Sequence, residues 1–280
     1  MTRAIDGRAI AAEVAEEVRG IVAGAVRPPR LAVVLPSDDE AASWYVRSIQ
    51  RTAGRVGIGV QVDELFESGG SALARRLELL SGDPDVDGII CQTPLPDGLR
   101  LADVGSYIEP GKDVDGANPL SLGRLAAGLR AFAPATAAAV LEILQREQVR
   151  LTGSRAVVVG RSIVVGKPAA LLLLAQDATV TVCHSRTADL AEVCSSADVL
   201  VAAVGRAGFI GASFIKPGAV VIDVGTNPVD DGGFVGDVAA DEAGAASALT
   251  PVPGGVGPVT TMMLMLHTAR AARAARTATG

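Results

Sequence analysis

Short runs of consecutive apolar residues alternate with amphipathic stretches through the first half of the chain. The runs, which are typical of strands covered on both faces of a parallel sheet, span 31–35, 57–65 and 86–92. Apolar residues recur at helical spacing over 5–26, 42–53, 71–80 and, more briefly, 103–108. The pattern therefore predicts a β-α-β-α-β layer in this half.

The second half repeats the alternation after a helix expected over 137–148, which Pro134 opens. Further strands are expected near 155–159, 179–183, 199–203 and 219–223, and a closing helix over 260–275. We therefore predict two α/β domains, the C-terminal one a Rossmann-type nucleotide-binding domain, with an active-site cleft between them. The first domain covers 1–135 plus the C-terminal helix at 260–280, and the second covers 136–259.

The second predicted domain begins with a glycine turn between a strand and a helix. The β-branched run Val157–Val159 leads into Gly160, and unpaired N–H groups at the start of the following helix would bind phosphate. Gly160 and Gly166 lie one residue farther apart than in the ordinary dinucleotide motif, and Ser162 replaces its middle glycine. The alternative is a tight turn without a ligand. The next strand, at the spacing of a βαβ unit, favours the phosphate site.

The tip of that next strand indicates which dinucleotide binds. An NAD site carries Asp or Glu there for the ribose hydroxyls, whereas this chain has His184, Ser185 and Arg186, with Arg161 in the first turn. Two guanidinium groups and a hydroxyl are suitable partners for a 2′-phosphate. We therefore predict NADP rather than NAD, the alternative being that these are solvated loop residues.

Composition excludes several other classes of function. The 280 residues are 49% hydrophobic but only 3% aromatic, and a net charge of −6 without a basic cluster argues against a nucleic-acid partner. The absence of a membrane-length apolar run and of a signal-peptide pattern predicts a cytoplasmic protein without a membrane partner. The three cysteines, Cys91, Cys183 and Cys194, lack metal-ligand spacing, and the two histidines are far apart, so no metal site is predicted.

Candidate chemistry lies where the predicted strands end. Gln92 follows a strand of the first domain, and Tyr45 lies on a helix expected to face the same opening. A loop rich in glycine and proline, 250–258, follows the last strand of the second domain. Ligands of open α/β sheets bind outside the carboxyl ends of the strands, and a cleft beside an NADP domain is suited to hydride transfer.

Four motifs, taken together, resemble those of one known family. They are Gly160-Arg161-Ser162-x-x-Val165-Gly166-x-Pro168, Cys183-His184-Ser185-Arg186-Thr187, Lys112-Asp113-Val114-Asp115-Gly116 and Thr250-Pro251-Val252-Pro253-Gly254-Gly255-Val256-Gly257-Pro258. In this order, over nearly the whole chain, they resemble the bifunctional methylenetetrahydrofolate dehydrogenase/cyclohydrolase family, usually called FolD. The resemblance implies NADP-dependent oxidation of 5,10-methylenetetrahydrofolate and hydrolysis of the methenyl product to 10-formyltetrahydrofolate. It also implies a homodimer, formed through the cofactor domains.

The resemblance further implies roles for individual residues. Tyr45 is similar to the family tyrosine that stacks on the folate, Gln92 to the active-site glutamine, and Asp115 to the aspartate that holds the pterin ring. The cofactor contacts are then expected at Gly160, Arg161, Ser162, Gly166, Ser185, Arg186 and Thr226, and the substrate loop at Pro253, Gly254 and Gly255. Structural alternatives stay open, because Tyr45 could be a half-buried helix residue and Asp115 could cap a turn.

One position departs from the family pattern in a way that affects the chemistry. The family has an active-site lysine one helical turn after the tyrosine, where it hydrogen-bonds the glutamine, whereas this chain has Ile49. Methenyl hydrolysis needs a group that handles protons around the attacking water, which isoleucine cannot do. The chain uses arginine for lysine almost throughout, so compositional drift would have produced arginine here. Arg47 and Arg51 are poor substitutes, since each lies about 200° around the helix from position 49.

Three hypotheses result. The first is an NADP-dependent dehydrogenase whose cyclohydrolase activity is lost or weak. The second keeps both activities, with Asp115 or Tyr45 activating the water. The third is a repurposed NADP-binding paralogue that acts on another substrate in a specialised pathway. Thr93, Ala135 and Ala137 also differ from the usual family residues and line the predicted cleft, with an effect that the sequence does not define.

Overall fold

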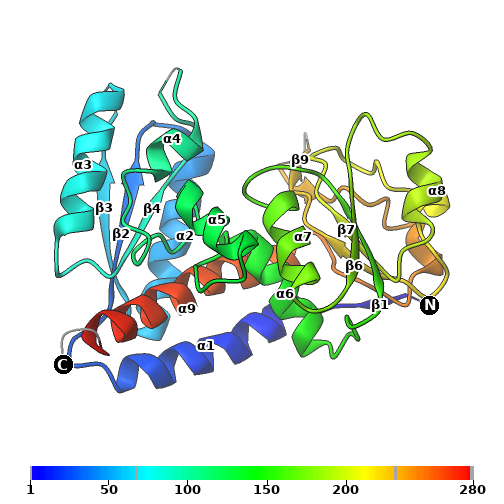
Figure 1. Cartoon of the computed structure of the whole chain (residues 1–280), viewed down its shortest axis with the longest axis horizontal. Helices are drawn as coiled ribbons and strands as arrows, with labels where there is room; N and C mark the ends of the chain where they lie inside the picture. Colours follow the sequence, from blue (N-terminus) through cyan, green and yellow to red (C-terminus); the bar gives the residue numbers. More distant parts are fainter. Residues whose placement is uncertain (1, 67–68, 97, 230–231, 278–280) are drawn as a thin grey trace. The chain divides into compact units, whose positions relative to one another are not determined.

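The computed structural model describes residues 2–66, 69–96, 98–229 and 232–277. The chain forms two compact units, each with its own parallel sheet (Figure 1). Glu13–Ala135 and Thr261–Gly280 form the three-stranded unit, and Met1–Ala12 and Thr136–Thr260 form the six-stranded unit. One boundary between the units lies at residue 135. The N-terminal segment differs from the prediction, because it was assigned to the first domain and belongs instead to the second.

The three-stranded unit has a sheet in the order β3-β2-β4, with all strands parallel. The strands are β2 (Arg30–Leu35), β3 (Gly59–Glu64) and β4 (Gly88–Cys91). The connecting helices are α2 (Glu40–Val56), α3 (Gly70–Gly82), α4 (Leu101–Gly105) and α5 (Pro119–Ala126). Leucines on one face of α3 pack against Ala32, Val34 and Ile89 of β2 and β4. All of β4 and all of β2 except Arg30 are buried, which explains the apolar runs of these two strands, whereas β3 is only partly buried.

Helix α2 has well-defined ends that place its residues accurately. The Asp39 side chain accepts a hydrogen bond from the N–H of Ala42 (2.8 Å), which caps the start of the helix. Gly57, in the left-handed conformation, ends it. The buried face carries Ala42, Val46, Ile49, Ala53 and Val56. The position corresponding to the family lysine is therefore directed into the protein interior.

The six-stranded unit has a parallel sheet in the order β1-β11-β8-β7-β5-β6. Its strands are β1 (Arg3–Ala4), β5 (Arg155–Val159), β6 (Thr179–Cys183), β7 (Val199–Ala202), β8 (Val220–Asp223) and β11 (Ala248–Leu249). Its helices include α6 (Ala135–Arg146), α7 (Gly166–Leu174) and α8 (Leu190–Cys194), and a small hairpin joins β9 (Asn227–Pro228) to β10 (Phe234–Val235). The strand order reverses between β5 and β7, which is where open α/β sheets bind nucleotides.

Several short elements were not predicted. Strands β1 and β11 have two residues each and exist because they pair with one another and with β8, which the local sequence does not reveal. This pairing places the N-terminal segment in the six-stranded unit. Helices α5 and α8 were also missed.

Two long helices complete the chain and differ slightly from the expected ranges. Helix α1 spans Gly7–Ala23, and α9 spans Val256–Thr277, which begins four residues before the predicted 260. Residues 278–280 of the predicted C-terminal helix lie outside the described residues. Across the described ranges, none of the helices combines the length and apolar character needed to cross a membrane.

Candidate functional site

The loop that carries Asp115 is held by a buried carboxylate two residues earlier. Asp113 is fully buried, and its oxygens accept hydrogen bonds from the N–H groups of Ala117 (2.8 Å) and Asn118 (3.0 Å) and from the hydroxyl of Ser121 (2.6 Å). Its backbone also bridges to Ile89 of β4. Asp113 therefore fixes the loop beside β4.

A histidine from the other end of the sequence holds the same loop. His267 of α9 is buried, and its Nδ1 lies 2.8 Å from the carbonyl oxygen of Val114, the residue before Asp115. Its ring packs on Phe132, with 5.1 Å between the ring centres. Burial lowers the pKa of His267 to about 4, so at neutral pH the ring is uncharged and Nδ1–H donates to the carbonyl.

Asp115 is partly buried, and its side-chain carboxyl group has a raised pKa. Removal from water raises its pKa to about 7, and the Asp113 carboxylate adds to this shift. A hydrogen bond from the Ala135 N–H (3.1 Å) to Oδ1 offsets a part of it. No lysine or arginine forms an ion pair with Asp115 within the described residues, so the carboxyl group is present in both protonation states near pH 7.

Tyr45 and Asp115 are brought together in the three-stranded unit. Burial raises the pKa of Tyr45 above its usual range, the Asp115 carboxylate raises it further, and a hydrogen bond with the Thr261 side chain acts in the opposite direction. The phenol therefore stays protonated at any physiological pH. Ile49 follows one turn later on α2 and has no exposed surface.

Gln92 lies at the predicted place, immediately after β4. Its backbone N–H donates to the carbonyl of Val34 (2.9 Å), which continues the pairing of β4 with β2. Its side chain is partly exposed and makes no hydrogen bond to any other described residue. The amide is thus available to a ligand.

The glycine turn of the six-stranded unit has the close backbone packing of a phosphate site. Gly160 has φ +136°, and a Cβ there would lie 2.2 Å from the carbonyl oxygen of Ala203. A Cβ on Gly166 would lie 2.1 Å from the carbonyl oxygen of Gly160. The Ser162 hydroxyl accepts hydrogen bonds from the N–H groups of Val165 (3.1 Å) and Gly166 (3.4 Å) at the start of α7. Only glycine fits at these two positions, as the dinucleotide fold requires.

The tip of β6 lies beside this turn. The N–H of Gly160 donates to the carbonyl of Cys183 (2.9 Å), and the His184 N–H donates to the hydroxyl of Thr187 (2.9 Å). Arg161, Ser185 and Arg186 are exposed, and within the described ranges their side chains have no ion-pair or hydrogen-bond partner. The glycine turn and the loop after β6 thus present two free guanidinium groups and a hydroxyl within the described residues.

The remaining predicted residues lie elsewhere in the six-stranded unit. Thr226 is exposed after β8, and Pro253, Gly254 and Gly255 lie in the loop before α9. Gly255 donates its N–H to the carbonyl of Pro251 (2.8 Å). A Cβ on Gly7 would lie only 1.8 Å from the Gly255 carbonyl oxygen, so the backbone at the start of α1 packs directly on this loop.

Comparison with known proteins identifies the family. The model of the tetrahydrofolate dehydrogenase/cyclohydrolase catalytic domain matches residues 5–115, and that of the NAD(P)-binding domain of the same family matches residues 134–276. The chain belongs to the tetrahydrofolate dehydrogenase/cyclohydrolase family, or FolD family. The recognition from the four motifs and the prediction of two α/β domains, the second nucleotide-binding, are confirmed.

Relatives of the chain cover it almost completely. The bifunctional protein FolD of Parafrankia sp. (strain EAN1pec) is 62% identical over 275 residues, which are 96% of this chain and 99% of the relative. The bifunctional FolD of Campylobacter jejuni has a similar structure, with a TM-score of 0.94 and 36% identity, covering 98% of this chain and 99% of that one. The Trypanosoma brucei FolD, in complex with NADP cofactor and inhibitor, has a TM-score of 0.92 and 36% identity over 100% and 99% of the two chains.

Sequence reasoning missed the residues that hold the candidate site in place. Asp113 was quoted only as part of a motif, and His267 and Thr261 were not assigned a role. A buried polar residue on a long apolar helix, such as His267 between Leu266 and Thr268, was the available signal. Its partner, Val114, is 153 positions away and could not be inferred from the sequence.

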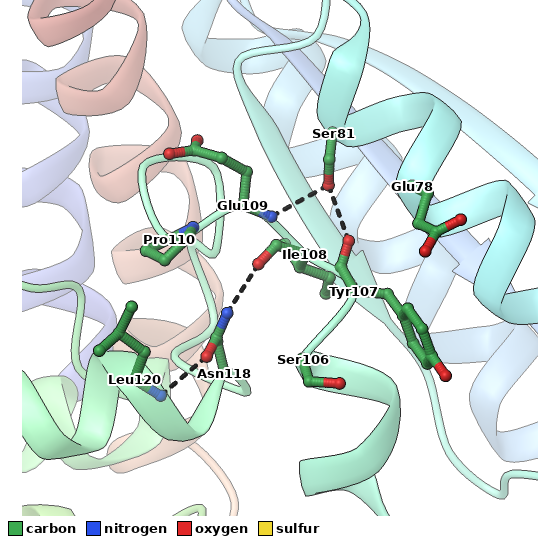
Figure 2. A pocket seen from close by; sticks show the side chains of 9 residues that line it. All are labelled: Glu78, Ser81, Ser106, Tyr107, Ile108, Glu109, Pro110, Asn118 and Leu120. Atoms are coloured by element: carbon green, nitrogen blue, oxygen red, sulfur yellow. Dashed lines mark hydrogen bonds between the residues drawn. The ribbon is translucent and has the colours of Figure 1, made fainter.

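Figure 2 shows a hollow in the three-stranded unit that none of the predicted site residues line. Its wall includes Ser81, Glu109 and Asn118, and the hydroxyl of Ser81 donates to the carbonyl of Tyr107 (3.0 Å) and accepts from the Glu109 N–H (3.0 Å). The Asn118 amide donates to the carbonyl of Ile108 (2.8 Å). These side chains hold the segment that leads to Asp115, so the hollow belongs to the support of the site.

Proposed function

We propose that this FolD-family enzyme oxidises 5,10-methylenetetrahydrofolate to 5,10-methenyltetrahydrofolate with NADP, and that it hydrolyses the methenyl product slowly or not at all. The observation that carries the second statement is Ile49, which is fully buried on α2 one turn after Tyr45. The position of the family lysine is therefore occupied by a group without a proton to exchange.

The folate side of the proposal rests on Tyr45, Gln92 and Asp115. The ionised Asp115 carboxylate would accept hydrogen bonds from the N–H donors of the pterin ring, and the loop that Asp113 and His267 hold keeps it in place. Tyr45 would offer its aromatic face, and Gln92 a free amide. Oxidation needs little acid or base help, because the nitrogen beside the one-carbon bridge shares the developing positive charge; the main requirement is alignment.

The cofactor side rests on the glycine turn and its two free arginines. The backbone around Gly160 and Gly166 leaves no room for side chains, which fits a bound pyrophosphate. Arg161, Ser185 and Arg186 would hold the 2′-phosphate that distinguishes NADP from NAD. When bound, NADP supplies the hydride acceptor. The NADP complex of the T. brucei relative supports this choice of cofactor.

The loss of hydrolysis follows from the chemistry of the side chains near Tyr45. An attacking water needs a group that accepts its proton, and the phenol of Tyr45 is held protonated by its raised pKa. Arg47 and Arg51 are exposed, away from the buried face of α2 that carries Ile49. Neither arginine therefore replaces the missing amine.

A second candidate is a fully bifunctional enzyme, as the names of the relatives state for those proteins. One structural observation favours it, since the pKa of Asp115 is about 7 and a carboxyl group with that pKa can act as a general base. Binding of the pterin donors works against this role, because such hydrogen bonds stabilise the carboxylate and weaken it as a base. The third hypothesis, a paralogue with another substrate, would require the enzyme not to bind folates.

Stopped-flow decay of methenyltetrahydrofolate separates these candidates, with buffer alone, wild type and Ile49→Lys compared beside NADP-dependent oxidation of methylenetetrahydrofolate. We expect wild type to oxidise the substrate and leave methenyl decay at the buffer rate, and Ile49→Lys to accelerate that decay. Ile49→Leu is the matched control, which keeps the volume without an amine. Fast hydrolysis by wild type would establish the bifunctional enzyme, and absence of oxidation and of folate binding would establish the paralogue.

We also propose that the enzyme is a homodimer formed through its six-stranded unit. Strand β6 is an edge strand with exposed Val182, and Leu174 at the end of α7 is also exposed. An uncovered edge with apolar side chains is a suitable surface for a second copy. Light scattering after size exclusion should give twice the 28.3 kDa chain mass, and Val182→Lys should give the monomer. A monomeric wild type would contradict the proposal.

A further inference from the structure

Two buried carboxylates lie at the carboxyl ends of β7 and β8 and have no place in the site described above. Asp223 is the last residue of β8, and Asp237 follows β10; their exposed fractions are 3% and 0%. Within the described residues neither forms an ion pair with a lysine, arginine or histidine. Their partners are instead backbone N–H groups.

Asp237 accepts hydrogen bonds from the backbone of the loop that follows β7. Its Oδ2 accepts hydrogen bonds from the N–H groups of Val204 (2.6 Å) and Gly205 (3.0 Å), and its Oδ1 accepts from the N–H of Arg206 (2.9 Å). Oδ1 also accepts from the side-chain amide of Asn227 (2.9 Å), which follows β8. One carboxylate therefore fixes the orientation of the peptide N–H groups of residues 204–206. Through Asn227 it also connects this loop to the loop after β8.

Asp223 holds that next loop and the segment of Asp237 itself. Its Oδ1 accepts from the N–H groups of Gly225 (2.9 Å) and Asp237 (2.9 Å), and its Oδ2 accepts from the N–H of Val238 (2.9 Å). The approach is close, because a Cβ on Gly225 would lie 2.4 Å from the Asp237 nitrogen. The Asp223 N–H in turn donates to the hydroxyl of Thr250 (2.7 Å), where the glycine-proline loop begins.

The sheet order gives this network its place relative to a bound dinucleotide. The strand order reverses between β5 and β7, and dinucleotides lie across the sheet at such a point. With the pyrophosphate at the Gly160 turn and the 2′-phosphate at the tip of β6, the other half of the cofactor extends over the ends of β7 and β8. Those ends carry residues 204–206 and 225–227, the two loops that the carboxylates hold.

We propose that Asp223 and Asp237 are positioning residues, which fix the backbone of 204–206 and 225–227 where the nicotinamide half of the cofactor lies. The inference rests on NADP as the cofactor. We assign the two carboxylates no direct contact with the cofactor, because both are buried and every donor described for them belongs to the protein. Because this backbone is already fixed, less conformational entropy is lost when the cofactor binds.

Binding titrations with NADP and with adenosine 2′,5′-bisphosphate test this, because the bisphosphate lacks the nicotinamide half. Asp237→Asn replaces one of the two carboxylate oxygens, which accept hydrogen bonds, by an NH2 group. This group is itself a donor and would face the backbone N–H donors of 204–206. We expect it to raise the Kd for NADP about tenfold and to leave the Kd for the bisphosphate within about twofold. The matched control is Asp198→Asn in the same unit, which replaces one of the two carboxylate oxygens that accept from the Arg155 N–H (2.9 Å) and Lys216 Nζ (2.6 Å) and should change neither Kd.

Equal weakening of both ligands would show a merely structural role and would overturn the proposal, as would unchanged NADP binding. If Asp237→Asn does not fold, Asn227→Ala decides, since it removes one of the four donors to Asp237. It should raise the Kd for NADP about threefold with the bisphosphate unchanged, and wild-type NADP binding would overturn the proposal. If the wild type binds neither ligand, the NADP assignment fails, and this inference falls with it.

Discussion

The loop around Asp115 and the tip of β6 are both proposed to hold a charged or polar part of a ligand, and they are built in opposite ways. Asp115 is partly buried in a loop that Asp113, His267 and Ala135 hold from three parts of the chain. Arg186 is exposed in a tight local turn, and its guanidinium group is free within the described residues. The first arrangement fixes one carboxylate in place at a cost in stability. In the second arrangement the guanidinium group of Arg186 stays exposed to solvent in the absence of a ligand.

The largest effect is expected from Asp115→Asn. The variant loses the carboxylate that would accept hydrogen bonds from the N–H donors of the pterin ring. Two charge-assisted hydrogen bonds contribute about 3 kcal/mol or more to binding. We therefore expect kcat/KM for the folate to fall at least about 100-fold. The appearance of reduced cofactor measures this. The exposed Asp85→Asn of the same unit should retain wild-type kinetics. A decrease of less than threefold for Asp115→Asn would remove Asp115 from substrate binding.

Arg186→Ala should have the next largest effect, confined to the cofactor. Losing one guanidinium partner of the 2′-phosphate costs about 2 kcal/mol, which predicts a rise of about 30-fold in KM for NADP and little change with NAD. Steady-state kinetics with both cofactors measure it, and Arg150→Ala, exposed in the same unit, is the control. The melting temperature should not change, because the side chain is exposed. An equal loss with NAD would refute its role at the phosphate.

His267→Ala should have a moderate effect on the folate side alone. Without the Nδ1–H bond to the Val114 carbonyl, the Asp115 loop is less well fixed, so KM for the folate should rise about fivefold while KM for NADP stays constant. His267→Gln, which can donate to the same carbonyl, should recover part of the loss. Thr268→Val is the matched control, since it removes a buried hydroxyl that, within the part of the chain the structure describes, donates to the Leu264 carbonyl alone. Parallel changes in both KM values would indicate general loss of structure.

A fourth effect is on stability rather than on kinetics, and it follows from the raised pKa of Asp115. Its pKa is about 7 in the folded protein and near 3.8 when unfolded, so folding favours the protonated form. The stability it contributes is full below about pH 4 and is lost as pH rises toward 7. Asp115→Asn, which is always neutral, should therefore be more stable than wild type at pH 8 by at most about 4 kcal/mol, a limit that solvent screening of the partly exposed group lowers, and equal to it at pH 4. Denaturant unfolding at both values checks this; a constant difference would contradict the raised pKa.

The sequence by itself determined the main elements and the local part of the site. The long strands and helices were predictable because each shows its own periodicity, and the Gly160 turn and the β6 tip were predictable because all their groups lie within one βαβ unit. Ile49 could also be placed one turn after Tyr45 from helix geometry alone.

Only the tertiary structure decided which distant groups hold that site. Strand β1 has two residues and joins the second sheet because β11 is available as a partner, which moved residues 1–12 into the other unit. The bond from His267 to Val114, the cage of N–H groups around Asp237 and the raised pKa of Asp115 all depend on burial and on partners far away in the chain. Burial is a property of the packed fold, so a local sequence pattern shows which residues are polar but not which polar groups are withdrawn from water.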